Sequence, residues 1–155
     1  MKVSALEEYA LRCLLQLARN YNKGIPLSSE EISSKELISP AYTEKILQKL
    51  SKSGFVKSIR GTKGGYILSD SPDKIFVGNV IREVDGFFVS DICNNFSGTS
   101  DECKNSLQCG IRPIWMNIYK YIYQVLDNTS LYDLLKDEDS ISKNLEKQFK
   151  ELSKV

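Results

Sequence analysis

Apolar residues recur at helical spacing in the first part of the chain. In residues 4–20 they form one stripe, at Leu6, Ala10, Leu14 and Leu17. Ser4 and Glu7 have the spacing of a capping box, in which a hydroxyl and a carboxylate each bind a free backbone N–H of the first turn. Ser28 and Glu31 repeat that spacing. Two amphipathic helices are therefore predicted, one starting at each box.

The next stretch predicts a third helix and then a β-hairpin. Ser39 is the expected N-cap, Pro40 suits the first helical position, and Gly54 ends the helix. Two short β-prone runs, 55–59 and 66–68, flank a glycine-rich turn. This order of elements is that of a winged helix-turn-helix domain. We expect a mainly α fold with a small β-hairpin wing.

The second half contains one helix that is too apolar for a small domain to cover. A short helix is predicted over 77–84, and a polar loop separates it from the apolar helix at 111–126. A second copy of the chain is the expected cover, which makes this a dimerisation helix in a homodimer. The predicted units are the winged domain (1–72), the short helix and cysteine loop (73–110), the dimerisation helix with a following short helix (111–135) and a charged amphipathic C-terminal helix (136–155).

Composition narrows the class of protein without identifying it. Apolar residues make up 41% and charged residues 26% of the chain, as in an ordinary soluble globular protein. No apolar run approaches the ~20 residues of a membrane helix, and Glu7, Glu8 and Arg12 interrupt any signal-peptide core. We expect a protein of the cytoplasm, a compartment in which thiols stay reduced, and we expect no membrane partner.

Positive charge is concentrated in one region, although the whole chain carries only +1. Between residues 39 and 68, Glu44 is the single acid, and the basic residues are Lys45, Lys49, Lys52, Lys57, Arg60 and Lys63. Such a cluster is typical of a protein that contacts the phosphates of double-stranded DNA. A solvated lysine-rich surface is the alternative, and the order of elements favours DNA.

Three cysteines, Cys93, Cys103 and Cys109, lie within seventeen residues of a chain that has no histidine. Their polar loop argues against buried structural thiols, and a cysteine nucleophile would need a histidine base. A thiol–disulfide switch and a zinc site stay open. An iron–sulfur cluster held by the three thiolates is favoured, while Cys13, on the apolar side of the first helix, belongs to the core.

Four motifs together resemble one known family. They are EEYALRCLLQLA (7–18), ISPAYTEKILQKLSKSGFVKSIRGTKGGYIL (38–68), VGNVIREVDG (77–86) and CGIRPIWMNIYKYIYQVLDNTSLYDLL (109–135). They are similar to the first helix, the DNA-binding region, the helix before the cluster loop and the dimerisation helix of the IscR/NsrR family of iron–sulfur winged helix-turn-helix regulators. The resemblance covers about residues 1–135. It implies a homodimeric, sequence-specific transcription factor, usually a repressor, whose DNA affinity depends on a bound cluster.

The resemblance also implies roles for particular residues. Ser39 and Tyr42 match positions at the start of the recognition helix and would hold phosphates. Glu44 would accept a hydrogen bond from a cytosine amino group, and Arg60, at the wing tip, would enter a minor groove. Position and charge add three further DNA-binding candidates, which are Lys45, Gln48 and Lys63.

For the cluster, whether two-iron or four-iron, the resemblance implies a fourth ligand from the first helix of the other subunit. Glu8 matches that position, and its neighbour Glu7 is engaged as the capping partner of Ser4. The histidine that some family members use is excluded here. The nine-residue gap between Cys93 and Cys103 is longer than the family usually has.

Two other functions stay open. One is a metal-free winged-helix regulator that is switched by cysteine oxidation or by a small metabolite. The other is an iron–sulfur or redox carrier, a class that has no use for a basic face. We expect no enzymatic activity.

Overall fold

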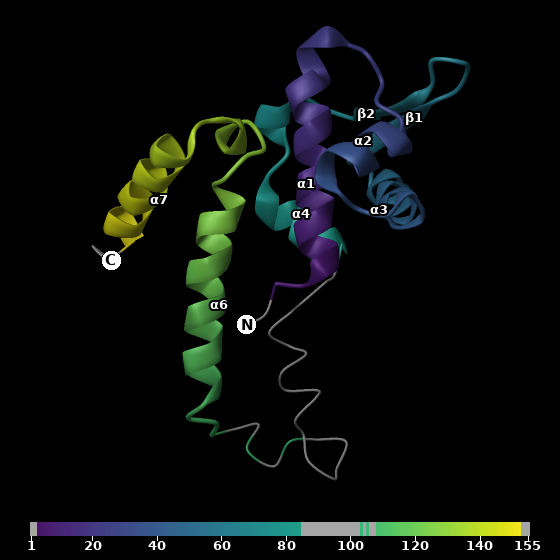
Figure 1. Cartoon of the computed structure of the whole chain (residues 1–155). Helices are drawn as coiled ribbons and strands as arrows, with labels where there is room; N and C mark the ends of the chain where they lie inside the picture. Colours follow the sequence, from purple (N-terminus) through teal and green to yellow (C-terminus); the bar gives the residue numbers. More distant parts are fainter. Residues whose placement is uncertain (1–2, 85–102, 104, 106–107, 153–155) are drawn as a thin grey trace.

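The computed structural model describes residues 3–84, 103, 105 and 108–152. Cys93 and Gly86 lie outside the described residues. The first elements are α1 (Ala5–Asn20), the 3-10 turn η1 (Tyr21–Lys23), α2 (Ser29–Glu36) and α3 (Pro40–Lys52). Figure 1 shows α1 in the middle of this domain, with α2 and α3 on one side of it.

These three helices begin at the caps that the sequence predicts. The Ser4 hydroxyl accepts the N–H of Glu7, and the Glu7 carboxylate accepts the N–H of Ser4 at 2.6 Å. The pair at the start of α2 bonds in the same way. Ser39 caps α3 by accepting the N–H of Tyr42 at 3.3 Å. The predicted starts are confirmed. The sequence could predict them because a cap depends only on residues three positions apart.

The core lies where the apolar stripes of the three helices meet. The fully buried side chains include Ala10, Cys13, Leu14, Ile32, Ile46, Leu47 and Leu50. Burial raises the pKa of the Cys13 thiol to about 12, so this thiol stays protonated. The expectation that Cys13 belongs to the core is confirmed.

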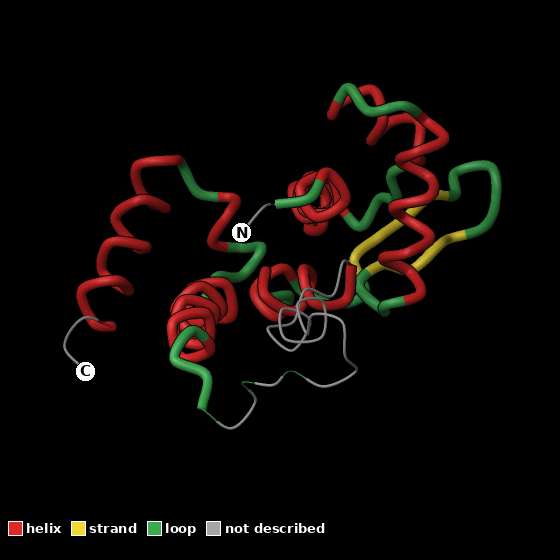
Figure 2. Tube along the Cα trace, turned by 90° about the horizontal axis from the view of Figure 1, so that it is seen from below, coloured by secondary structure: helices red, strands yellow, loops and turns green. Residues whose placement is uncertain are grey.

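The hairpin follows α3 and consists of β1 (Val56–Ile59) and β2 (Gly65–Leu68). The strands are antiparallel, with Val56 opposite Leu68 and Ile59 opposite Gly65. The predicted runs were one residue off at their starts. Phe55 lies between α3 and β1, because its N–H donates back to the carbonyl of Leu50 on α3 at 2.9 Å. Figure 2 shows both strands at the edge of the molecule, where the hairpin forms a wing.

The remaining elements are η2 (Pro72–Lys74), α4 (Val77–Val84), α6 (Arg112–Asp127), η3 (Asp133–Leu135) and α7 (Glu138–Leu152). The C-terminal end of α6 packs against α4, where Arg82 donates to the Asp127 carboxylate at 2.7 and 3.2 Å. The N-terminal part of α6 extends away from the winged domain, and α7 lies on the far side of α6 (Figures 1 and 2).

The fold class is confirmed as mainly helical with a two-stranded wing. The division into four units stays a prediction. Among the helices of the described residues, none combines the length and the apolar character that crossing a membrane requires.

Candidate nucleic-acid interface and cysteine site

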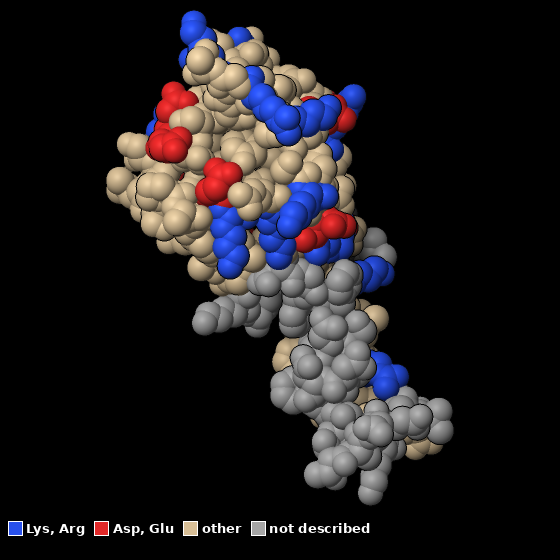
Figure 3. Space-filling model, turned by 90° about the vertical axis from the view of Figure 1, so that its right-hand side faces the viewer, with Lys and Arg blue, Asp and Glu red and all other residues tan. Residues whose placement is uncertain are grey.

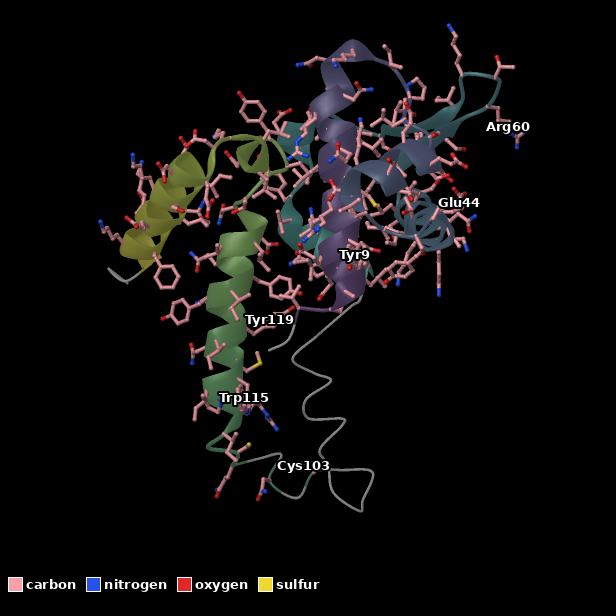
Figure 4. The ribbon with its side chains drawn as sticks, in the orientation of Figure 1. Tyr9, Glu44, Arg60, Cys103, Trp115 and Tyr119 are labelled. Carbon is pink, nitrogen blue, oxygen red and sulfur yellow. The ribbon has the colours of Figure 1, made fainter. Side chains whose placement is uncertain are left out.

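The predicted DNA-binding residues lie on α3, at its cap, and on the wing. Figure 4 shows Glu44 on α3 and Arg60 at the wing, both on the side of the molecule away from α6. Glu44 and Tyr42 are half-buried, and the other predicted residues are exposed, namely Ser39, Lys45, Gln48, Arg60 and Lys63. The structure therefore presents one surface made by a helix and a hairpin, and contact of these residues with DNA stays a prediction.

A tight turn sets the direction of α3 relative to α2. Leu37 ends α2 in the left-handed conformation, with φ 55°, and it is the only non-glycine residue with positive φ in the described part of the chain. The N–H of Ile38 returns to the carbonyl of Ser33 at 3.1 Å, and the Ser33 hydroxyl donates to the carbonyl of Ile38 at 2.6 Å. Ile38 is buried below the turn, while the Leu37 side chain is 92% exposed. This turn aims the start of α3 outward.

Basic side chains gather on the surface formed by α3 and the wing, with a few acidic side chains between them (Figure 3). We call this surface the basic face, defined by Lys45, Lys49, Lys52, Lys57, Arg60 and Lys63. None of these six cations belongs to an ion pair among the residues that the structure describes. They are therefore available for phosphate, whose neutralisation dominates the affinity of proteins for DNA.

Glu44 is held from the wing. The Tyr66 hydroxyl on β2 donates to Oε1 of Glu44 at 2.8 Å, and Nε2 of Gln48 donates to the same oxygen at 3.2 Å. The Tyr66 hydrogen bond is the main cause that lowers the pKa of the Glu44 carboxyl, which burial alone would raise. Burial and the neighbouring Glu44 charge in turn raise the pKa of Tyr66 to about 12. Near neutral pH the pair is a carboxylate that accepts from a neutral phenol.

The wing is also joined to the start of α2 through its backbone. Tyr66 accepts from the N–H of Leu27 at 3.1 Å and donates to the Leu27 carbonyl at 2.8 Å. Gly65 makes this approach possible, because a Cβ at that position would lie 2.5 Å from the Leu27 oxygen. The strand that carries Tyr66 is thus held against the helix-turn-helix.

Sequence reasoning missed the role of Tyr66, which it had assigned only to a strand. Tyr66 and Glu44 are 22 positions apart, and no short-range spacing links them. The motif GGY next to a predicted wing was the available signal, since paired glycines mark a place where another backbone comes close.

Tyr42 and Glu8 are connected through the first helix. The ring of Tyr42 packs edge-on against Tyr9, with centroids 5.9 Å apart, and the Arg12 guanidinium lies over the Tyr9 ring at 5.7 Å. Nε of Arg12 donates to Oε1 of Glu8 at 2.8 Å in an exposed ion pair. Glu8, the predicted cluster ligand, therefore lies at the surface with a cation as its neighbour.

The two described cysteines of the predicted cluster lie at the N-terminal end of α6. Cys103 and Cys109 are half-buried free thiols, and Figure 4 shows Cys103 well away from Tyr9, the residue after Glu8. The contribution of Glu8 by the other subunit stays a prediction. Within the described residues, which omit Cys93, no group of three metal-ligating side chains comes together.

Cys109 has the chemistry of a thiolate ligand. Its Sγ accepts the N–H of Arg112 at 3.3 Å, at the start of α6. Backbone hydrogen bonds from Arg112 and Ile111 lower the pKa of the Cys109 thiol, as is usual for cysteines at a helix N-terminus. Because thiolates are the usual ligands of iron–sulfur clusters, Cys103 and Cys109 fit such a group as far as the described chain extends.

Comparison with known proteins identifies relatives along most of the chain. The profile of the Rrf2 family, described as iron-dependent transcriptional regulators, matches residues 3–137. The HTH-type transcriptional regulator IscR of Aliivibrio salmonicida is 34% identical over 139 residues, which are 90% of this chain and 80% of IscR. CymR of Bacillus subtilis is 33% identical over 139 residues, which are 90% of this chain and 93% of CymR. NsrR of Bacillus licheniformis is 32% identical over 146 residues, which are 94% of this chain and 99% of NsrR.

The fold agrees with a solved relative. The structure of CymR, described as the global cysteine regulator of B. subtilis, superposes with a TM-score of 0.72 at 31% identity, and the match covers 88% of this chain and 99% of CymR. The relatives are thus helix-turn-helix transcriptional regulators of similar length.

Proposed function

Because the chain belongs to the Rrf2 family of iron-dependent transcriptional regulators, we propose that it is a homodimeric repressor whose affinity for a specific operator is controlled by an iron–sulfur cluster. It acts in the cytoplasm and senses iron status, redox state or nitric oxide. The coarser function, a DNA-binding transcriptional regulator, follows from the family itself. The finer parts of the proposal rest on separate observations.

The observation that carries DNA recognition is the shared surface of α3 and the wing. Glu44 on α3 reads a base edge in the major groove, Arg60 enters the neighbouring minor groove, and the lysines of the basic face contact phosphates. Ser39 and Tyr42 hold phosphates at the start of α3, and Gln48 is a further DNA-binding residue of the same helix. This division assigns affinity to the cations and sequence discrimination to Glu44.

Replacing Arg60 with alanine tests the assignment. We expect Arg60→Ala to weaken binding and to lower the slope of log K against log salt by about 0.9, because one cation fewer displaces counterions from the DNA. Fluorescence anisotropy at several salt concentrations measures both quantities. Lys143→Ala on α7, exposed and remote from the wing, is the control. Equal effects of the two substitutions would contradict the role of the basic face.

The homodimer proposal rests on the exposed apolar face of α6. Its large apolar side chains are 43% or more exposed, at Ile114, Trp115, Met116, Ile118 and Tyr121, with Ile111 just before the helix. In the described chain only Tyr123 of α6 is buried. A face of this size on one subunit marks an interaction surface. A second copy related by a two-fold axis would cover this face, and such a dimer would present two recognition helices to two half-sites.

The cluster proposal rests on the thiols at the start of α6. Cys93, Cys103 and Cys109 are its ligands, together with Glu8 of the partner subunit. A bound cluster supplies the group that responds to iron, oxidants or nitric oxide. The hydrogen bond from Arg112 favours the thiolate of Cys109, and the Glu8 carboxylate lies exposed, paired with Arg12 through Oε1. A carboxylate beside thiolates is the weaker ligand, which suits a sensor.

Anaerobic purification tests the cluster. We expect a brown protein that contains iron and sulfide and binds its operator. Cys109→Ser and Cys103→Ser should lose most of the iron, whereas Cys13→Ala, which removes a buried core thiol, should retain it. Glu8→Ala should retain a cluster that air destroys faster. An unchanged iron content in Cys109→Ser, or an unchanged air stability in Glu8→Ala, would contradict the corresponding ligand.

A metal-free regulator is the second candidate, and the likeness to CymR favours it, since that relative is described as a cysteine regulator. A colourless anaerobic protein that binds DNA would support this candidate. A brown protein that does not bind DNA would instead support an iron–sulfur carrier.

A further inference from the structure

The hydroxyl of Tyr66 bonds to Glu44, the single acidic residue between positions 39 and 68. Oη of Tyr66 is 2.8 Å from Oε1 of Glu44. The donor comes from β2 and the acceptor from α3, so the hydrogen bond connects the wing to the recognition helix. The Gln48 amide approaches the same oxygen from within α3. A glutamate on an exposed helix surface ordinarily samples several rotamers, and here two side chains from two elements select one.

The position of the Tyr66 hydroxyl is itself fixed by the backbone. Both backbone groups of Tyr66 bond to Leu27, at 2.8 and 3.1 Å, and Gly65 leaves room for that contact. A tyrosine ring has only two side-chain torsions, so an anchored backbone places its hydroxyl with little freedom. The attachment of β2 to Leu27 therefore fixes the position from which the Tyr66 hydroxyl donates to Glu44.

We infer that Tyr66 is a positioning residue for base recognition, whose hydroxyl holds the Glu44 carboxylate in the orientation in which it accepts from a base in the major groove. The inference rests on the proposed function, in which Glu44 reads a base. An ionised carboxylate has about four acceptor sites. The Tyr66 hydroxyl and the Gln48 amide both donate to Oε1, so acceptor capacity remains for an amino group.

The energetic reason is preorganisation. Ordering a long side chain when it meets its target costs binding free energy, and a side chain that is already ordered avoids this cost. The benefit applies only where Glu44 has a base to accept from. Tyr66 should therefore affect discrimination at one base pair, and should leave binding to other sequences nearly unchanged.

Two substitutions and their combination test the inference on the full-length chain. Wild-type protein first selects its preferred duplex from a random-sequence pool, and dissociation constants are then measured for that duplex, for each single-base variant and for a random duplex. Tyr66→Phe removes the hydroxyl and keeps the ring and the backbone contacts. Glu44→Ala removes the carboxylate that is proposed to accept from the base. Tyr21→Phe, which removes an exposed hydroxyl in η1, is the matched control.

We expect Tyr66→Phe to reduce discrimination about 3- to 10-fold, at the same base pair that Glu44→Ala affects. Affinity for random duplex should stay within about 2-fold of wild type, and the double variant should discriminate no worse than Glu44→Ala alone. Tyr21→Phe should match wild type.

Two results would overturn the inference while leaving the proposed function intact. One is wild-type discrimination in Tyr66→Phe while Glu44→Ala relaxes a base pair. The other is an equal loss on operator and random duplexes, which marks a structural role. If Glu44→Ala relaxes no position, the proposed reading of a base by Glu44 fails, and the inference fails with it.

A second measurement does not depend on DNA. The carboxyl carbon of Glu44 can be titrated by NMR in wild type and in Tyr66→Phe. Since the Tyr66 hydrogen bond is the main cause of the lowered pKa of Glu44, we expect that pKa to rise in the variant toward its ordinary value. An unchanged pKa would show that the hydrogen bond does not order the carboxylate in solution, and would also overturn the inference.

Discussion

Leu37 combines two features that a single residue seldom carries. Its backbone is left-handed, with φ 55°, and its side chain is 92% exposed. The left-handed conformation costs an L-amino acid with a side chain about 1–2 kcal/mol, and glycine or asparagine usually occupies such a helix end. The hydrogen bonds of Ser33 and Ile38 around the turn hold this conformation. The turn that directs α3 therefore lowers the free energy of unfolding of the protein.

Replacing Leu37 with glycine should therefore stabilise the protein. We expect the free energy of unfolding to rise by about 0.5–1 kcal/mol, because relief of the left-handed conformation exceeds the extra chain entropy of glycine. Urea titration followed by circular dichroism measures the change. Ser34→Gly, at an exposed position within α2, is the control and should lose about 0.5–1 kcal/mol. A loss of stability in Leu37→Gly would contradict the assignment of strain.

The contact between the wing and the start of α2 is the feature of interest among the elements. A hairpin of two four-residue strands has little stability of its own. The hydrogen bonds between Leu27 and Tyr66 give β2 a neighbour on its other edge. The reach of Tyr66 to Glu44 depends on this attachment.

Replacing Gly65 with alanine should detach the wing. The new Cβ would lie 2.5 Å from the Leu27 oxygen, and we expect a loss of about 1–3 kcal/mol, as for other overpacking substitutions. Gly61→Ala is the control, because Gly61 also has positive φ but has nothing within 4 Å of its Cβ position. Thermal unfolding compares the two. If both variants lost the same stability, backbone strain alone would explain the effect, and the close approach to Leu27 would not matter.

For the whole molecule, the feature of interest is the exposed apolar face of α6, which the proposed dimer would cover. One subunit packs this helix against α4 through the bond between Arg82 and Asp127, and leaves its N-terminal part outside the winged domain (Figure 1). The proposed ligand set joins Cys103 and Cys109 of one subunit to Glu8 of the other, so in the proposed dimer cluster binding and the spacing of the recognition helices would be connected.

Replacing Ile118 with aspartate should separate the subunits. An unpaired charge buried at the interface costs about 3–5 kcal/mol. We therefore expect the dissociation constant of the dimer to rise by more than 100-fold, and tight operator binding to be lost. Size-exclusion chromatography with light scattering gives the mass. Lys120→Asp, at an exposed polar position on the same helix, should stay dimeric. If Ile118→Asp remained a dimer, the interface would lie elsewhere.

The sequence was sufficient for those features that neighbouring residues encode. The capping boxes at Ser4 and Ser28 and the cap at Ser39 each depend on contacts three positions apart, and the hairpin after Gly54 pairs residues 6 to 12 positions apart. The apolar excess of α6 is likewise a property of composition and spacing, and its exposure agrees with the expectation of an uncovered helix. The burial of Cys13 follows from its place on the apolar stripe of α1.

Packing was required for the contacts that cross between elements. The attachment of Tyr66 to Leu27 joins residues 39 positions apart, and the hydrogen bond of Tyr66 to Glu44 joins residues 22 positions apart. Periodicity cannot reveal such pairs, because their separation depends on how α1, α2 and α3 pack and on where the turn at Leu37 directs the chain. The sequence could therefore name Glu44 as a candidate reader, whereas the fold identified the side chain that orients it.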